Sequence, residues 1–212
     1  MPDIDPPADY DGTPRRHLLA ANTPVWRLHP VSRSPFEFAE STEGDRFPGR
    51  AHRGADEPRG LVAEILLRSL PPTDRFRTLP RVRVKGRRMT ALATEDELEL
   101  LTLCDATDLA AVGQTHWLIT TTDCDSERMR RWTDWLRDRA PEAAGFIWPA
   151  RRAPQDRLVV LFEDRVLRDK VFQPDPLVSV DLETEFGALW LNTLLVHHGY
   201  RVSPPRTRPA QR

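Results

Sequence analysis

Short apolar segments along this chain have the length and the alternation of β-strands. Residues 25–29 (VWRLH) place apolar and polar side chains on alternate faces, and residues 158–162 (LVVLF) form a continuous apolar run. The other segments of this kind are residues 79–84, 88–93, 98–103 and 145–148. A turn at Gly86 is expected between residues 79–84 and residues 88–93. Residues 145–148 and 158–162 are close enough in sequence to be neighbours in one sheet.

Three other segments have the apolar spacing of amphipathic helices. Residues 60–69 (GLVAEILLRS) predict a short helix stopped by two prolines, and residues 105–112 predict another. Residues 125–139 give the clearest helix. Its apolar stripe consists of Met129, Trp132 and Leu136.

Residues 183–198 predict a further helix, and Gly199 is a suitable residue to end it. Its apolar face consists of Phe186, Leu189, Trp190 and Leu194. A helix of about 16 residues is marginal alone in water. We therefore expect this face to be buried, against its own domain rather than against a second chain.

Strands mixed with short helices, without regular βαβ spacing, predict an α+β fold with a central mixed sheet flanked by short helices. Residues 1–22 and 203–212 are rich in proline with few apolar residues, so we expect a disordered arm and a disordered tail. The main domain is expected over residues 23–170, followed by an extension over residues 171–202 that carries the C-terminal helix. Residues 30–59 are polar and nearly aperiodic, which is typical of a functional or disordered loop.

The charge balance of the chain favours no polyanionic partner. The formal net charge is −1, so no excess of one sign attracts nucleic acid or anionic lipid. Arginine supplies nearly all of the positive charge, and the lysines are Lys85 and Lys170. The basic run RVRVKGRR at residues 81–88 could contact nucleic acid, but it also alternates like a strand and acidic segments flank it. We therefore expect no nucleic-acid partner.

Targeting, membrane and metal signals are weak in this sequence. The first ten residues are acidic and rich in proline, unlike a signal peptide, and no segment approaches the roughly 20 apolar residues of a membrane span. Cys104 and Cys124 are isolated, whereas zinc sites and disulfide scaffolds need more cysteines or histidines at close spacing. These features predict a cytoplasmic protein with reduced thiols, no metal and no membrane association.

Four segments, taken in order, resemble the RES-domain family. They are VWRLHP at residues 25–30, GDRF at 44–47, LVAEILL at 61–67, and the pair from GFIWPARR to VVLFEDR within 145–165. In the family the first carries an aromatic–arginine pair on the opening strand, and the second resembles a Gly-x-Arg-aromatic element. The third resembles a helix with a glutamate, and the fourth resembles a closing pair of strands. The resemblance covers residues 25–166.

This resemblance implies an ADP-ribosyltransferase-like fold and a toxin that cleaves NAD⁺ at the nicotinamide–ribose bond, by hydrolysis or by phosphorolysis. It implies Glu64 as the carboxylate that stabilises the oxocarbenium-like centre left by nicotinamide. Arg27 and Arg46 would be ligands of the phosphates or the ribose. NAD⁺ is then the substrate, no cofactor is implied, and the partner is a small antitoxin protein. A homo-oligomer is left open.

Two positions depart from the family pattern. The family has a tyrosine about ten residues before its helix glutamate, where this chain has AHRG at residues 51–54, and it has a serine where this chain has Ala150. Alanine cannot donate the hydrogen bond of a serine hydroxyl. The alternative function is therefore a catalytically impaired RES fold that binds a nucleotide or an antitoxin. A different ADP-ribose-handling protein on the same scaffold is a third hypothesis.

Ordinary roles are open for each of these site residues. Glu64 and Arg68 are spaced i and i+4, which suits a surface ion pair. Arg27 suits an outward position on an edge strand, and Arg46 suits a solvated loop. A shared site requires instead that Arg27, Arg46 and Glu64 converge on one cleft. Ala150 is then expected on the strand floor of that cleft.

Overall fold

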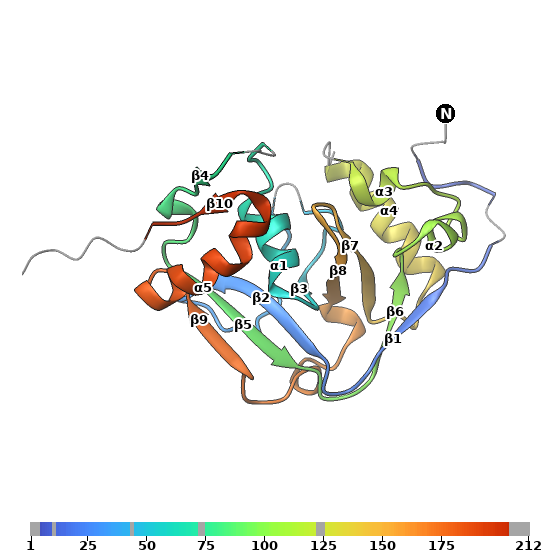
Figure 1. The fold of residues 1–212 in the computed structure, drawn as a ribbon. Coiled ribbons are helices and arrows are strands. Elements are labelled where there is room, and N and C mark those ends of the chain that lie inside the picture. Colours follow the sequence, from blue (N-terminus) through green and yellow to red (C-terminus); the bar gives the residue numbers. More distant parts are fainter. Residues whose placement is uncertain (1–4, 10–11, 43–44, 72–74, 122–125, 204–212) are drawn as a thin grey trace, which may run out of the picture.

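The structure of this 212-residue chain is a computed structural model, which describes residues 5–9, 12–42, 45–71, 75–121 and 126–203. The tail predicted over residues 203–212 lies outside these ranges except for Ser203, and so do Gly44, Cys124 and parts of the predicted N-terminal arm. A large mixed sheet with short helices makes up most of the described chain, as Figure 1 shows. The predicted α+β class with a mixed sheet is confirmed.

The large sheet has eight strands in the order β1-β6-β7-β8-β3-β2-β5-β9. The strands are β1 Arg16–Leu19, β2 Pro24–Pro30, β3 Ala51–Ala55, β5 Arg87–Ala93, β6 Leu98–Thr102, β7 Gly145–Ala150, β8 Ala153–Phe162 and β9 Val178–Asp181. β6 and β7 are parallel, and the other neighbouring pairs are antiparallel. β4 Arg77–Thr78 and β10 Tyr200–Arg201 form a separate two-stranded parallel ladder.

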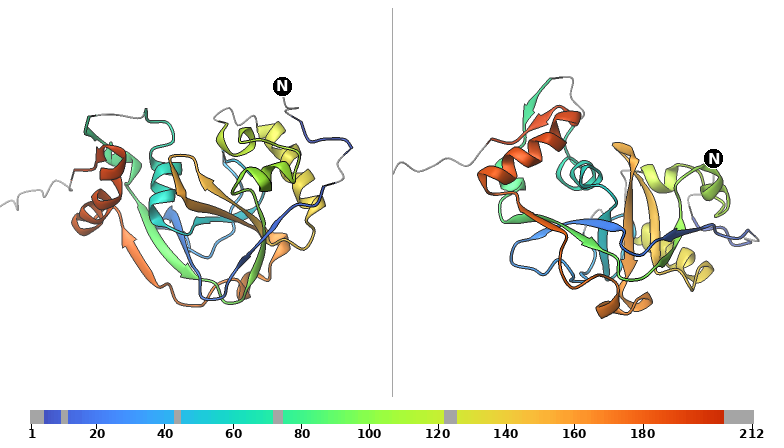
Figure 2. Two further views of the ribbon diagram at one scale, coloured as in Figure 1. Left: turned by 45° about the vertical axis from the view of Figure 1, so that its right-hand side comes forward. Right: turned by 60° about the horizontal axis from the view of Figure 1, so that its bottom comes forward.

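Short helices lie at both ends of the curved sheet and between them. The α-helices are α1 Pro58–Leu61, α2 Ala106–Ala110, α3 Trp117–Thr120, α4 Ser126–Arg139 and α5 Glu185–Leu195. The other helical turns are η1 Val62–Leu66, η2 Arg81–Arg83, η3 Glu163–Arg165, η4 Arg168–Lys170 and η5 Val196–His198. Figures 1 and 2 show α2, α3 and α4 beside β6, α5 beside β9, and α1 between these two groups. The sheet thus carries two helical flanks with α1 between them.

Two hydrophobic clusters cover the two faces of the sheet. Phe146 belongs to the larger cluster and its neighbour Ile147 to the smaller, because successive strand residues point to opposite faces. The predicted stripe of α4 is buried in the larger cluster. Its members are Met129, Trp132 and Leu136. The prediction for this helix is therefore confirmed in both extent and face.

Two local predictions about strands are wrong. The segment predicted as a strand over residues 79–84 contains η2, a 3₁₀ turn, and the guanidinium of Arg81 donates to the carbonyls of Ser203 and Glu183. The stretch predicted as a loop over residues 30–59 contains β3, an interior strand between β2 and β8. β3 has the sequence AHRGA, whose small residues give no apolar alternation, yet Ala51 and Ala55 are fully buried.

The predicted ends of the domain also need correction. Arg16–Leu19, expected in a disordered arm, forms β1 and pairs with β6, because Leu19 is buried while Arg16 forms an ion pair with Glu99 at 2.7 Å. Val178–Asp181, assigned to an extension, pairs with β5 as the edge strand β9 of the same sheet. The fold therefore continues past residue 170.

The C-terminal helix docks on its own domain, as expected, but with a different face. Its buried residues are Gly187, Ala188, Leu191 and Leu195. Phe186 and Leu189, predicted to be buried, are 68% and 60% exposed, and Trp190 is partly buried in a stack on Trp26. Small residues decide the orientation, because a Cβ added at Gly187 would lie 1.9 Å from the carbonyl oxygen of Asp181. The helix backbone therefore lies directly against the end of β9.

Candidate functional site

A cavity opens where β2 and β3 separate. The ladder between these interior strands consists of the pair Trp26–Ala55. Beyond that pair lies a chamber of about 620 Å³. It is lined by β2, β3, the loop between them, η1 and the turn before β5. Ligand cavities in proteins commonly have volumes of 300–1,000 Å³. We call this cavity the cationic chamber, after seven lining residues. They are Arg27, Arg33, Arg53, Arg68, Arg83, Lys85 and Arg87.

A narrow slot of about 60 Å³ adjoins the chamber. Asp45, Arg53, Ile65 and Arg68 line both spaces, so the two form one continuous cleft. We call the narrow part the Glu64 slot. Its further lining residues include Arg46, Phe47, Leu61, Glu64, Trp148 and Leu158. The slot therefore combines one carboxylate with aromatic and aliphatic walls.

Glu64 lies in the middle of η1, which is a π-helical turn. The amide of Leu67 donates to the carbonyl of Val62, five residues earlier, and single π-turns of this kind are frequent at functional sites. The preceding helix α1 is fixed to β8, because Arg59 donates to both oxygens of Asp156 at 3.0 and 2.6 Å. Asp156 is 1% exposed, so this ion pair holds the helix that carries Glu64 in a defined position.

The Glu64 carboxylate has no hydrogen bond or ion pair with any residue that the structure describes. Arg68 does not form the surface pair that the i, i+4 spacing suggested. Its Nε donates to the backbone oxygen of Glu64 at 3.0 Å, and its guanidinium lies 3.9 Å from Asp45. The carboxylate is thus half-buried, open to the slot and available to a ligand.

Arg27 and Arg46 lie at this cleft, and each guanidinium donates to two backbone carbonyls. Arg27 lines the chamber and donates to the carbonyls of Pro35 at 2.9 Å and of Glu37, and its burial lowers its pKa to about 10. Arg46 lines the Glu64 slot and donates to the carbonyls of Leu118 and Thr121 at 2.8 and 2.9 Å. Neither is the solvated or outward-facing arginine of the ordinary interpretation, since both are less than 10% exposed.

Ala150 does not form part of the cleft floor. It is fully buried at the end of β7 and lines a separate pocket with Cys104, His116 and Arg157. Trp148, two residues earlier on the same face of β7, is the residue of this strand that lines the Glu64 slot. The placement expected for Ala150 is therefore wrong, because the strand leaves the cleft before it reaches this position.

Most of the cations in the chamber were missed by sequence reasoning. Arg53 lies in AHRG, the segment that lacks the tyrosine of the family. The basic run at residues 81–88 suggested a contact with nucleic acid rather than a part of this site. Asp45 is the counterion at the boundary between chamber and slot, 3.5 Å from Arg53 and 3.9 Å from Arg68. The sequence signal for a cationic site was the high density of arginines in and around the polar, aperiodic segment at residues 30–59.

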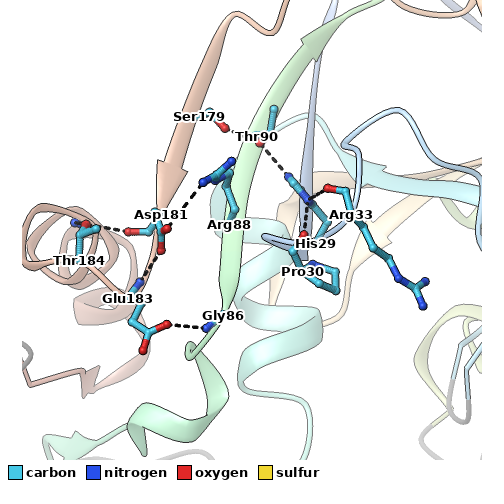
Figure 3. A network of polar contacts seen from close by, with 11 residues as sticks. His29, Pro30, Arg33, Gly86, Arg88, Thr90, Ser179, Asp181, Glu183 and Thr184 are labelled. Carbon is cyan, nitrogen blue, oxygen red and sulfur yellow. Dashed lines mark hydrogen bonds and ion pairs between the residues drawn. The ribbon is translucent and has the colours of Figure 1, made fainter.

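Two buried histidines support the back of the chamber. Figure 3 shows the ring of His29 between the carbonyls of Pro30 and Arg33 on one side and Thr90 on the other. Two carbonyls at Nδ1 require a proton there, so Nε2 accepts from the Thr90 hydroxyl at 2.9 Å. His52 donates through Nε2 to the carbonyl of Pro35. Burial is the largest cause that lowers the pKa of both rings below 6.5.

We expect these histidines to make the protein less stable below about pH 6.5. A histidine with a lowered native pKa stays neutral while the unfolded chain takes up the proton, so stability is lost as the pH falls. Each such group contributes up to about 1.4 kcal/mol per pH unit to the free energy of unfolding. Urea unfolding at pH 7.5 and 5.5 measures the loss, and His52→Gln should reduce it. His17→Gln, at an exposed position in β1, is the control, and an equal loss in both variants would contradict the assignment.

No helix among the described residues is long and apolar enough to cross a membrane. The same part of the chain contains no group of three or more histidine, cysteine, aspartate or glutamate residues placed to hold a metal ion.

Comparisons with known proteins agree with this architecture. The sequence matches the RES domain family over residues 24–182. The fold is similar to a chain in the crystal structure of the M. tuberculosis MbcT–MbcA toxin–antitoxin complex, with a TM-score of 0.51 and 19% sequence identity. That similarity covers 78% of this chain and 86% of the other, and at this identity it concerns the fold. No curated protein matches the sequence significantly.

Proposed function

The chain belongs to the RES-domain family, and we propose that it is the toxin of a toxin–antitoxin pair that cleaves NAD⁺ at the nicotinamide–ribose bond. The observation that carries this proposal is the Glu64 carboxylate, which makes no hydrogen bond or ion pair with the described residues and lies beside a chamber rich in cations. One cleft thus offers a negative group for a developing cation and positive groups for phosphates.

The two parts of the cleft suit the two parts of the dinucleotide. The diphosphate would lie in the cationic chamber, where guanidiniums and an ammonium form charge-assisted hydrogen bonds with phosphate oxygens. The nicotinamide ribose would lie at the slot, where Phe47 and Trp148 provide apolar walls. This orientation places the bond to be broken beside Glu64.

Charge stabilisation by Glu64 is the central step of the proposed reaction. When the C–N bond breaks, nicotinamide leaves with the bonding electron pair and positive charge develops on the ribose ring. A carboxylate close to this centre stabilises it, and the π-turn together with the Arg59–Asp156 pair holds that carboxylate in place. Water or phosphate then adds to the ribose carbon and gives ADP-ribose or its phosphorylated form.

Nicotinamide release tests this function directly. We expect purified protein to convert NAD⁺ to nicotinamide, and mass spectrometry of the second product in buffers with and without phosphate will identify the acceptor. Heat-denatured protein is the control. Absence of nicotinamide after prolonged incubation with stoichiometric protein would rule out the enzymatic function.

A binding module is the second candidate, because this chain has Ala150 and AHRG where the family has a serine and a tyrosine. Alanine offers no hydroxyl, whereas Glu64 and the cations of the cleft are retained. In this alternative the protein binds NAD⁺ or ADP-ribose with measurable affinity and releases no nicotinamide. Calorimetric titration beside the activity assay separates the two functions.

The proposed partner is a small antitoxin protein. The similar fold described above comes from a toxin–antitoxin complex, which supports a partner of this kind. We expect a small protein encoded next to this chain to co-purify with it and to suppress nicotinamide release. Full activity in the presence of excess neighbouring protein would contradict this pairing.

A further inference from the structure

We propose that the turn formed by Lys85, Gly86 and Arg87, at the start of β5, is the diphosphate-binding element of the cationic chamber. The identity of the ligand rests on the proposed function. The assignment differs from the one implied by the sequence, which gave this role to Arg27 and Arg46. The cations of the chamber differ in whether they already bind groups of the protein.

Arg27 and Arg53 both donate to backbone carbonyls, Arg27 through Nη1 alone and Arg53 through both terminal nitrogens. Arg27 holds the carbonyls of Pro35 and Glu37. Arg53 donates to the carbonyls of Ala39, Phe47 and Gly49, at 3.3, 3.1 and 2.8 Å, and also lies 3.5 Å from Asp45. These hydrogen bonds shape the loop between β2 and β3. A phosphate could bind Arg53 only by displacing these carbonyls or Asp45, and Arg27 could bind one only through the nitrogens that hold no carbonyl.

Three more cations of the chamber also have partners. Arg33 forms an ion pair with Glu37 at 3.7 Å. Arg68 contacts the backbone of Glu64 and the carboxylate of Asp45, as described above. Arg83 donates to the hydroxyl of Ser69 at 2.8 Å.

Lys85 and Arg87 differ from these five residues. Their side chains make no hydrogen bond or ion pair with any residue in the described part of the chain, although both line the chamber. A lysine ammonium has three donors, and an arginine guanidinium has five in a planar fork that matches phosphate oxygens. All the donors of these two side chains are therefore open to a phosphate without displacing a protein group.

The turn is held in place from both sides. Gly86 has φ +63°, its carbonyl accepts from the amide of Val31, and its amide donates to the Glu183 carboxylate at 2.9 Å. Figure 3 shows Glu183 approaching Gly86 from the β9 side, and Glu183 does not line the chamber. The backbone of the turn is thus ordered before a ligand binds, which lowers the entropic cost of binding.

Strand geometry separates Arg87 from its neighbour. Arg87 lies opposite Pro30 in the ladder with β2, and Arg88 lies opposite His29. The side chain of Arg88 points towards β9, where it contacts Asp181 at 3.7 Å, as Figure 3 shows. Alternation along the strand therefore directs Arg87 to the other face. Within the basic run at residues 81–88, Arg87 thus lines the chamber, whereas its neighbour Arg88 contacts Asp181.

The local charge also favours an anion. Seven cationic side chains line the chamber against two carboxylates, Glu40 and Asp45, while the whole protein carries a net charge of −1. A cavity lined by one sign of charge concentrates ligands of the opposite sign. The diphosphate of a dinucleotide carries two negative charges, which Lys85 and Arg87 together can balance.

The first test is ligand affinity in a double variant. We expect Lys85→Ala/Arg87→Ala to weaken binding of ADP-ribose by about 10-fold or more, because two charge-assisted contacts are lost. The KM for NAD⁺ should rise by a similar factor with kcat little changed, since neither residue lies at the Glu64 slot. Lys170→Ala, which removes the other lysine at an exposed site, is the matched control. An unchanged affinity in the double variant would overturn the proposal.

The second test does not depend on activity. Acetylation of the wild-type protein by sulfo-NHS-acetate, followed by mass spectrometry, compares Lys85 with Lys170. We expect ADP-ribose and inorganic pyrophosphate to protect Lys85 and to leave Lys170 unprotected. Protection of Lys85 by pyrophosphate without nicotinamide release would support this site and refute the proposed enzymatic function. If the protein releases nicotinamide but neither probe reduces the acetylation of Lys85 relative to Lys170, this site is refuted and the proposed enzymatic function is not.

Discussion

Replacement of Glu64 by glutamine is expected to lower the rate of nicotinamide release by about 100-fold to 1,000-fold, the usual effect of losing one preorganised electrostatic contact. Glutamine has nearly the same shape but no charge, so it cannot stabilise the positive charge that develops on the ribose. The KM for NAD⁺ should change little, because the phosphates bind elsewhere in the cleft. Steady-state release of nicotinamide measures both quantities.

A matched glutamate distinguishes this effect from a general loss of charge. Glu57 lies just before α1, is exposed, and makes no side-chain cap for the helix, so Glu57→Gln should retain the wild-type rate. Thermal unfolding of both variants should be close to that of the wild type, because the Glu64 carboxylate makes no hydrogen bond or ion pair with the described part of the protein. Wild-type activity in Glu64→Gln would remove this carboxylate from the mechanism.

Glu64 could be identified from the sequence, but its surroundings could not. The apolar period of residues 60–69 predicted a helix, and the motif that resembles the RES family singled out its glutamate. The helix α1 that precedes the π-turn is held by Arg59 and Asp156, which are 97 residues apart in sequence. Contacts at such separation leave no local periodicity, and so the position of the carboxylate had to come from the structure.

The arginines show the opposite case, in which residue type was informative and role was not. Arg27 lines the chamber and Arg46 lines the slot, but a sequence pattern cannot show whether a guanidinium meets a ligand or a carbonyl. The loop between β2 and β3 buries Phe38 and Phe47 and leaves polar backbone between them. Arg27 and Arg53 donate to carbonyls of this loop, which must be paired when they lie away from water.

The C-terminal helix shows how apolar residues alone can mislead. Its largest side chains marked one face, whereas the docked face consists of two small residues and two leucines. Close approach of the helix to β9 excludes large side chains at the contact, and the glycine that permits this approach carries no hydrophobic signal. The conflict can be settled with two leucines of the same helix, Leu189 and Leu191.

Leu191→Ala is expected to lower the free energy of unfolding by about 2–5 kcal/mol, the usual cost of truncating a fully buried leucine. Leu191 is 0% exposed in the main hydrophobic cluster, so the truncation leaves a cavity that the surrounding side chains only partly fill. Leu189→Ala removes the same atoms two positions away, where the side chain is 60% exposed, and should cost less than about 1 kcal/mol. Urea unfolding of both variants, with solution mass measured alongside, tests the assignment. A larger loss in Leu189→Ala than in Leu191→Ala would show that the helix docks with the face that the sequence predicted.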